Sequence, residues 1–303
     1  MSPDCRFTVC LGLGTSASPA GLVCDPASGR YELAEAVNVE VAAGRIVRRP
    51  GMIRLSDTGF ADLFSDGPNL YGVRDGGLWH IPDQGGPRLL RDGLTPGARM
   101  AFVAVGGTVY FANGHETGRI RDGVATDWKS AGAYPGPDRS GRYVPPPAGH
   151  LLAAFAGRIF LACGSLVRFT EGAGLLEWVD SLAGFLPPAT GRVRLLAPVT
   201  GGLFIGDDAG VVFAAGTDPK TMAFARVCPA PPLPGSEVLL PAGRREAVAG
   251  RDLCGDAVLW AAPDGLYCGL ASGRVSRLAA ANIPAACAVA VADHGRYRLY
   301  CSE

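Results

Sequence analysis

The residues best suited to specific polar contacts lie near the N-terminus, where arginines gather around a short turn. Arg45, Arg48, Arg49 and Arg54 follow Asn38 in this stretch. Guanidinium groups bind carboxylates through paired, planar hydrogen bonds, which suits a contact with a neighbouring subunit. The same charges could instead protect an exposed edge strand from aggregation. We therefore predict an assembly contact at these five residues, with edge protection as the alternative.

Side chains that could support catalysis or bind a metal are scattered. The four histidines share no spacing of the kind that a zinc site requires. Asp207-Asp208 lacks the pattern of a calcium loop, and turn chemistry explains it. No nucleophile, phosphate-loop or dinucleotide motif occurs in a supporting context. We predict no catalytic residue, no metal and no cofactor. The histidines are His80, His115, His150 and His294.

Composition and charge restrict the class of protein. The 28 Lys and Arg residues balance 28 Asp and Glu residues, which argues against a general nucleic-acid-binding protein. With 43 Gly, 24 Pro and 48% hydrophobic residues, many short strands joined by tight turns are favoured over disorder. The nine cysteines form no CxxC pair and predict free thiols made in a reducing compartment. We find no signal-peptide pattern and no apolar run of about 20 residues, so we predict no membrane insertion.

The arginines fall on the second arm of a predicted hairpin. Residues 37–41 alternate, Gly44 marks a turn, and residues 46–49 return. A strand is predicted at residues 6–11, followed by an irregular stretch. Residues 1–55 are thus predicted to form an N-terminal arm and β-hairpin. Single helical turns are predicted at residues 31–36 and 218–223.

The rest of the chain repeats a pattern of three strands separated by turns. The repeat length is about 40–50 residues, which is typical of propeller blades with three or four strands. The middle strands are continuous apolar runs, as expected for strands buried on both faces. The chain ends on one more hairpin, at residues 287–291 and 297–300. The five predicted copies span residues 60–81, 99–121, 151–169, 193–214 and 257–278.

These observations predict an all-β protein with a single β-propeller of about six blades over residues 56–303. Five or seven blades are the alternatives. We expect an N-terminal strand to close the last blade against the C-terminal hairpin, because closure removes exposed edges. A pair of β-sandwiches would need a break in composition, and a β-solenoid would need a shorter repeat. The Pro- and Gly-rich stretches 131–149 and 228–241 are predicted to be loops between blades, and 131–149 could also be a domain linker.

The pattern A-x-N-V-x-V-x-x-x-G-x-I-x-R-R-P-G, from Ala36 to Gly51, resembles a segment near the N-terminus of certain tailed-bacteriophage virion proteins. These are β-propeller proteins such as tail nozzles, DNA-stabilisation proteins and tail structural proteins, in which an arm and hairpin precede the blades. The final strand, residues 297–300, is also similar to their closing blade. The resemblance implies a non-enzymatic structural component of the tail or head–tail junction, acting as a nozzle, connector or tail-tip adaptor.

The resemblance also implies partners and a location. The partners would be other virion tail or connector proteins and further copies of this chain in a homo-oligomeric ring, with non-specific contact to packaged DNA. The protein would reside in the virion and assemble in the host cytoplasm. The alternative is a cellular β-propeller that serves as a protein-binding scaffold or, less in keeping with the residues, a propeller hydrolase. A scaffold would expose an apolar patch at one mouth of the propeller, and a hydrolase would gather carboxylates or histidines there.

Overall fold

The computed structural model shows an all-β chain that forms two compact units. One unit comprises Met1–Thr58 with Ala280–Ile283, and the other comprises Gly59–Ala279 with Pro284–Glu303. In the described part of the chain, no helix is long and apolar enough to cross a membrane. The described residues are 9–13, 21–25, 27–33, 39–42, 44–48, 59–130, 134, 142–172, 175–179, 184–187, 189–240, 245–248, 251–254, 256–293 and 296–302.

The N-terminal unit contains two small sheets. In the first, β3 pairs with β1 in parallel and with β2 in antiparallel orientation. The second is the predicted hairpin, β4–β5, with its turn at Gly44. The amide of Cys10 donates to the Gly44 carbonyl at 2.7 Å and joins the two sheets. The strands are β1 (Val9–Leu13), β2 (Cys24–Asp25), β3 (Arg30–Leu33), β4 (Val39–Ala42) and β5 (Arg45–Arg48).

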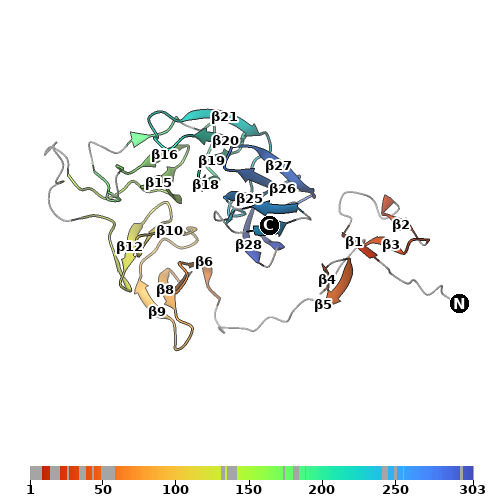
Figure 1. Cartoon of the computed structure of the whole chain (residues 1–303). Helices are drawn as coiled ribbons and strands as arrows, with labels where there is room; N and C mark the ends of the chain where they lie inside the picture. Colours follow the sequence, from red (N-terminus) through yellow and green to blue (C-terminus); the bar gives the residue numbers. More distant parts are fainter. Residues whose placement is uncertain are drawn as a thin grey trace. The chain divides into compact units, whose positions relative to one another are not determined.

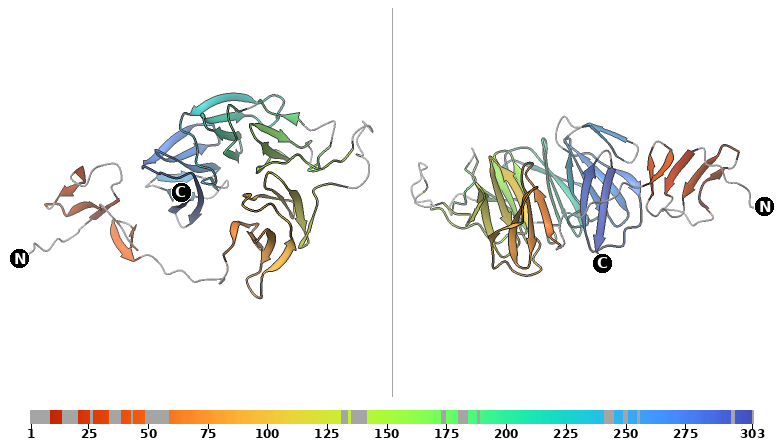
Figure 2. Two further views of the ribbon diagram at one scale, coloured as in Figure 1. Left: turned by 180° about the vertical axis from the view of Figure 1, so that it is seen from behind. Right: turned by 90° about the horizontal axis from the view of Figure 1, so that it is seen from below.

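The larger unit is a β-propeller of six successive antiparallel sheets, coloured from orange to blue in Figure 1. In each of the first four sheets, four strands pair in chain order. The sheets stand side by side around an arc in the left view of Figure 2. These four sheets are β6–β9 (Ala61–Ser65, Leu70–Arg74, Gly77–Ile81, Arg88–Arg91), β10–β13 (Ala101–Val105, Thr108–Ala112, Thr117–Arg121, Val124–Thr126), β14–β17 (Leu151–Phe155, Arg158–Cys163, Leu166–Phe169, Gly184–Phe185) and β18–β21 (Leu195–Val199, Gly202–Asp207, Gly210–Ala215, Ala223–Cys228).

The last two sheets depart from this order. The fifth sheet has the strand order β22-β25-β26-β27, because the hairpin β23–β24 is inserted after its first strand. The last sheet contains β28 and β29, which pair with each other in antiparallel orientation. Their bounds are β22 (Val238–Leu240), β23 (Arg245–Val248), β24 (Arg251–Cys254), β25 (Ala257–Ala262), β26 (Gly265–Leu270), β27 (Val275–Ala280), β28 (Cys287–Asp293) and β29 (Arg296–Ser302).

The core of the propeller lies between neighbouring sheets. Strands β11, β19 and β25 are buried along their whole length, so their side chains supply apolar surface on both faces of their sheets. Five apolar clusters therefore join the six sheets in sequence. Their buried members include Phe111 between the first and second sheets, Trp128 between the second and third, Phe160 between the third and fourth, Trp260 between the fourth and fifth, and Leu259 between the fifth and last.

Several local predictions were wrong. Residues 31–33 belong to strand β3, and residues 218–222 form a turn, so neither described part of the predicted helical turns is helical. The stretch 228–241 contains β22, the first strand of the fifth sheet. The segment 257–261 is consequently the second strand of its sheet and not the first. The last sheet contains no N-terminal strand among the described residues, so the predicted closure stays a prediction.

Candidate assembly site

The predicted arginine contact falls partly on the hairpin β4–β5. Arg45 and Arg48 lie at the two ends of β5, where both side chains are exposed. Because they are three positions apart on a strand, they point to opposite faces of the hairpin. Arg45 pairs with Ala42, and Arg48 with Val39, across the hairpin. The other predicted residues, Asn38, Arg49 and Arg54, lie outside the described residues.

The structure also brings together a polar cluster that the sequence did not predict, where the first and last sheets meet. Its first member is Asp62, which sits at an irregularity in the pairing of β6 with β7 and has a φ of 49°. A bulge of this kind redirects a side chain out of the regular strand pattern. The Asp62 carboxylate accepts the Met100 amide at 2.8 Å, and burial raises its pKa. Asp62 therefore ties β6 to the beginning of β10.

Arg99 connects this carboxylate to the end of the chain. Its Nε lies 3.8 Å from Oδ1 of Asp62. Its Nη1 donates to the carbonyl of Pro234 at 3.1 Å, and its Nη2 donates to the carbonyl of Ala288 at 2.8 Å. The Ala288 amide also donates to the Pro234 carbonyl, at 2.9 Å. One guanidinium thus links the first sheet, the segment before β22 and the first strand of the last sheet.

Glu237 and Tyr297 complete the cluster. Oε2 of Glu237 is buried and has no hydrogen-bond partner among the described residues, and burial raises the pKa of the carboxyl group. The Tyr297 hydroxyl donates to the Ser236 carbonyl at 2.5 Å, and burial raises its pKa as well. The Ser236 hydroxyl is itself engaged, since it donates to the Leu233 carbonyl at 2.6 Å. This arrangement holds β-strands together and leaves one unsatisfied carboxylate oxygen.

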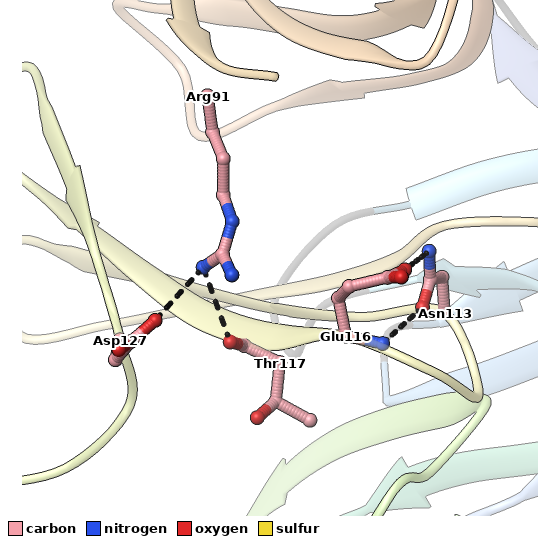
Figure 3. A network of polar contacts seen from close by, with 5 residues as sticks. All are labelled: Arg91, Asn113, Glu116, Thr117 and Asp127. Carbon is pink, nitrogen blue, oxygen red and sulfur yellow. Dashed lines mark hydrogen bonds and ion pairs between the residues drawn. The ribbon is translucent and has the colours of Figure 1, made fainter. Parts of the chain in front are cut away.

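A second polar network connects the first and second sheets (Figure 3). Arg91, on β9, donates to Asp127 at 3.2 Å and to the Thr117 carbonyl at 3.4 Å. Asn113 and Glu116 exchange hydrogen bonds in the turn between β11 and β12, at 2.5 and 2.7 Å. Burial opposes ionisation of Glu116, but its hydrogen bonds, one of them from the Thr95 hydroxyl at 2.6 Å, lower its pKa overall. Each of these polar groups is bound by a neighbour within its own set, Arg91 with Asp127 and Thr117, and Glu116 with Asn113 and Thr95, which indicates a structural role.

An apolar pocket with a volume of about 200 Å³ lies beside the fourth sheet. Ile205, Val212 and Phe224 contribute apolar walls, and Arg226 stands among them. The carboxylate of Asp207 also lines the pocket, yet it accepts the backbone amides of Thr190, Gly191 and Ala209 at 2.7, 3.0 and 2.8 Å. The prediction that Asp207 serves turn geometry is therefore confirmed.

The histidines do not meet in the described part of the propeller. Nε2 of His150 lies 2.7 Å from the Val193 carbonyl, and burial lowers the pKa of its ring. His80 packs against Tyr71, with ring centroids 5.6 Å apart. Among the described residues there is no group of three or more His, Cys, Asp or Glu side chains that could hold a metal ion.

Comparisons with known proteins give little beyond the fold. No protein-family model and no curated protein matches the chain. Similar solved structures include the extracellular domain of a proposed one-component system of B. thetaiotaomicron, which is 12% identical with a TM-score of 0.44. That similarity covers 74% of this chain and 28% of the other. A proposed gluconolactonase is 14% identical with a TM-score of 0.41, over 74% of this chain and 84% of the other.

These comparisons carry no argument about ligand, activity or partner. The chain spans less than a third of the first of these structures. The class is instead defined by the chain's own strands: an all-β propeller protein with six sheets and a separate N-terminal strand unit.

Proposed function

We propose that the protein is a non-enzymatic structural component of a tailed-bacteriophage virion, at the tail or head–tail junction. The pattern from Ala36 to Gly51 carries this proposal. Its central part forms the hairpin β4–β5, and a propeller follows it in the chain, as in the proteins that the pattern resembles. In this role the protein forms a homo-oligomeric ring, and its arm contacts a neighbouring copy or another tail protein. Its place is the virion, where it could also touch packaged DNA without sequence preference.

The exposed arginines support an assembly contact. Arg45 and Arg48 extend from both faces of a short hairpin, which allows them to reach carboxylates on two sides. Planar guanidinium groups are well suited to such contacts. Their charge is local, since the chain as a whole has a formal net charge of zero.

Two measurements test the proposal: the mass of the protein in solution and its presence in purified phage particles. We expect light scattering of the full chain to give a multiple of the 31.3 kDa monomer. The double variant Arg45→Glu/Arg48→Glu should dissociate, whereas Arg121→Glu/Arg274→Glu, which reverses two exposed arginines of the propeller, should not. Mass spectrometry of purified phage particles should detect the protein. A monomeric full chain that is also absent from particles would contradict the proposal and favour a cellular scaffold.

A further inference from the structure

The pocket beside the fourth sheet opens on the face that this sheet turns toward the third sheet. Ile205 on β19, which belongs to the cluster joining these two sheets, pairs with Val212 on β20, and Val212 pairs with Arg226 on β21. Residues that pair directly across strands point to the same face of a sheet. Phe224 lies two positions before Arg226 and shares that face. One wall of the pocket is therefore a row of two aliphatic side chains that ends at a cation and an aromatic ring.

The third sheet is too narrow at its outer edge to cover this row. Its outer strand, β17, has only two residues, whereas β21 of the fourth sheet has six. Beyond β17 the chain provides the other wall of the pocket through Pro187, Ala189 and Thr190. The unequal lengths of the two outer strands thus leave a space of about 200 Å³ beside the fourth sheet.

The two charged groups of the pocket differ in what they already bind. Three backbone amides donate to Asp207, so its carboxylate is engaged within the protein. Arg226 is exposed, and its guanidinium makes no hydrogen bond or ion pair with any other described residue. The donors of that guanidinium are therefore available to a ligand.

These features define the chemistry of a ligand. A guanidinium binds a carboxylate through two parallel hydrogen bonds, and apolar walls bind an apolar body. Asp207 places a negative charge in the same pocket, which disfavours ligands with two or more negative charges. An apolar cavity of about 150 Å³ can hold benzene, so a volume of about 200 Å³ leaves room for a carboxylate group as well.

We propose that this pocket binds a small organic monocarboxylate with an aromatic or branched aliphatic body. The carboxylate accepts hydrogen bonds from Arg226, and the apolar body lies against the side chains of Ile205, Val212 and Phe224. The inference goes beyond the virion role. All residues of the pocket belong to the propeller unit, so a monomeric propeller would bind the same ligand.

Titration of the full chain with benzoate, followed by methyl NMR, tests this inference. We expect the methyl signals of Ile205 and Val212 to shift saturably, with a dissociation constant on the order of 1 mM for so small a ligand. The methyl signals of Ile120, which is buried between the first and second sheets, should not respond. Benzamide has nearly the same shape without the charge and should bind about tenfold more weakly.

Two variants separate the contribution of charge from that of shape. Arg226→Gln should weaken the binding of benzoate about tenfold and abolish the preference for benzoate over benzamide. Arg274→Gln, which removes another exposed arginine at the turn between β26 and β27, should change neither. Val212→Phe fills the pocket and keeps the charge, so it should weaken the binding of benzoate and benzamide alike.

Three results would overturn the inference. If benzoate shifts neither methyl signal at about twenty times the expected dissociation constant, the pocket takes no such ligand. Equal binding of benzoate and benzamide, or an equal loss in Arg226→Gln and Arg274→Gln, would remove Arg226 from the site. A peptide with a C-terminal phenylalanine that binds about tenfold more tightly than benzoate would assign the pocket to the end of a partner protein chain instead. Each of these results leaves the light-scattering and particle tests of the virion role unaffected.

Discussion

Glu237 is one of three described residues with a buried side-chain polar atom that has no hydrogen-bond partner. Carboxylates that lose contact with water are normally hydrogen-bonded, and an unpartnered oxygen is costly. Burial raises the pKa of this carboxyl group above its ordinary value of 4.5, although the nearby Arg99 opposes that shift. The folded state thus binds a proton on Glu237 more tightly than the unfolded chain does.

This shift predicts a dependence of stability on pH. A raised folded-state pKa contributes stability that is fully present below the ordinary pKa and is lost as pH rises through the folded-state value. We expect Glu237→Gln to remove this loss. The free energy of unfolding of the variant, relative to that of wild type, should therefore rise by about 1–3 kcal/mol as the pH increases from 4.5 to neutral or above. Thermal unfolding at several pH values measures the gain. The exposed change Asp83→Asn serves as a control, and equal pH profiles for wild type and Glu237→Gln would refute the prediction.

The cysteines predict a pattern of chemical labelling. Cys24 and Cys301 are exposed, whereas Cys228 is buried and burial raises the pKa of its thiol. Because the thiolate is the reactive form, burial and a raised pKa both slow alkylation. We expect a maleimide to label Cys24 and Cys301 in the native protein and Cys228 only after denaturation, as read by peptide mass spectrometry. Native labelling of Cys228 at the rate of Cys301 would show that the fourth sheet opens readily.

At the scale of elements, close contact between strands depends on a few glycines. Gly118 on β12 pairs with Phe111 on β11. A Cβ added at Gly118 would overlap Cζ of Phe111 and lie 2.8 Å from the Thr126 carbonyl. Since Phe111 is fully buried and Thr126 belongs to the neighbouring strand β13, neither can move without disturbing the sheet.

Gly118→Ala should therefore destabilise the protein by about 2–4 kcal/mol through overpacking. Urea denaturation followed by circular dichroism would measure the loss. Gly86→Ala is a suitable control, since a Cβ at Gly86 meets nothing within 4 Å. A loss of stability that is equally small in the two variants would mean that Phe111 can be accommodated elsewhere.

The sequence predicted the inner strands better than the outer ones, for a physical reason. Strands such as β11 and β19 are buried on both faces, so their sequences are continuous apolar runs, a pattern that indicates a buried strand. The fourth strands β13 and β17 have three and two residues and are partly exposed, so their sequences resemble turns. The prolines of 228–241 suggested a loop, although the short strand β22 lies within it.

The polar cluster could not be predicted, because its members are far apart in the chain. Asp62, Arg99 and Glu237 share no motif, and each is unremarkable in its local sequence. What brings them together is the return of the last sheet to the first, which no periodicity specifies. Only the bulge at Asp62 could have given a signal, and the position carries no glycine or proline to mark it. The hairpin β4–β5 was predictable because alternation and a turn glycine coincide in one short stretch, whereas the assembly contact at its arginines stays a prediction.

At the scale of the whole propeller, stability depends on contacts between neighbouring sheets. Five apolar clusters join six sheets in sequence, as in proteins built from stacked repeats. In such a stack the terminal elements are the most easily lost, because each has a partner on one side only. The polar cluster around Arg99 counteracts the loss of the terminal sheets, since it binds β28 of the last sheet to β6 of the first.

Arg99→Lys should therefore loosen the end of the propeller selectively. Lysine keeps the charge but cannot donate to the Pro234 and Ala288 carbonyls with the geometry of a guanidinium. We expect a loss of about 1–3 kcal/mol in the free energy of unfolding, with amide exchange accelerated more in β28 than in β15.

Arg88→Lys is the matched control, because Arg88 is exposed and donates to a single carbonyl, that of Gly123, at 2.8 Å. Equal losses in the two variants, or exchange that rises equally in all sheets, would mean that the first and last sheets are joined mainly by other contacts. A selective effect on β28 would instead show that the Arg99 guanidinium, placed between β6 and β28, holds the last sheet to the first.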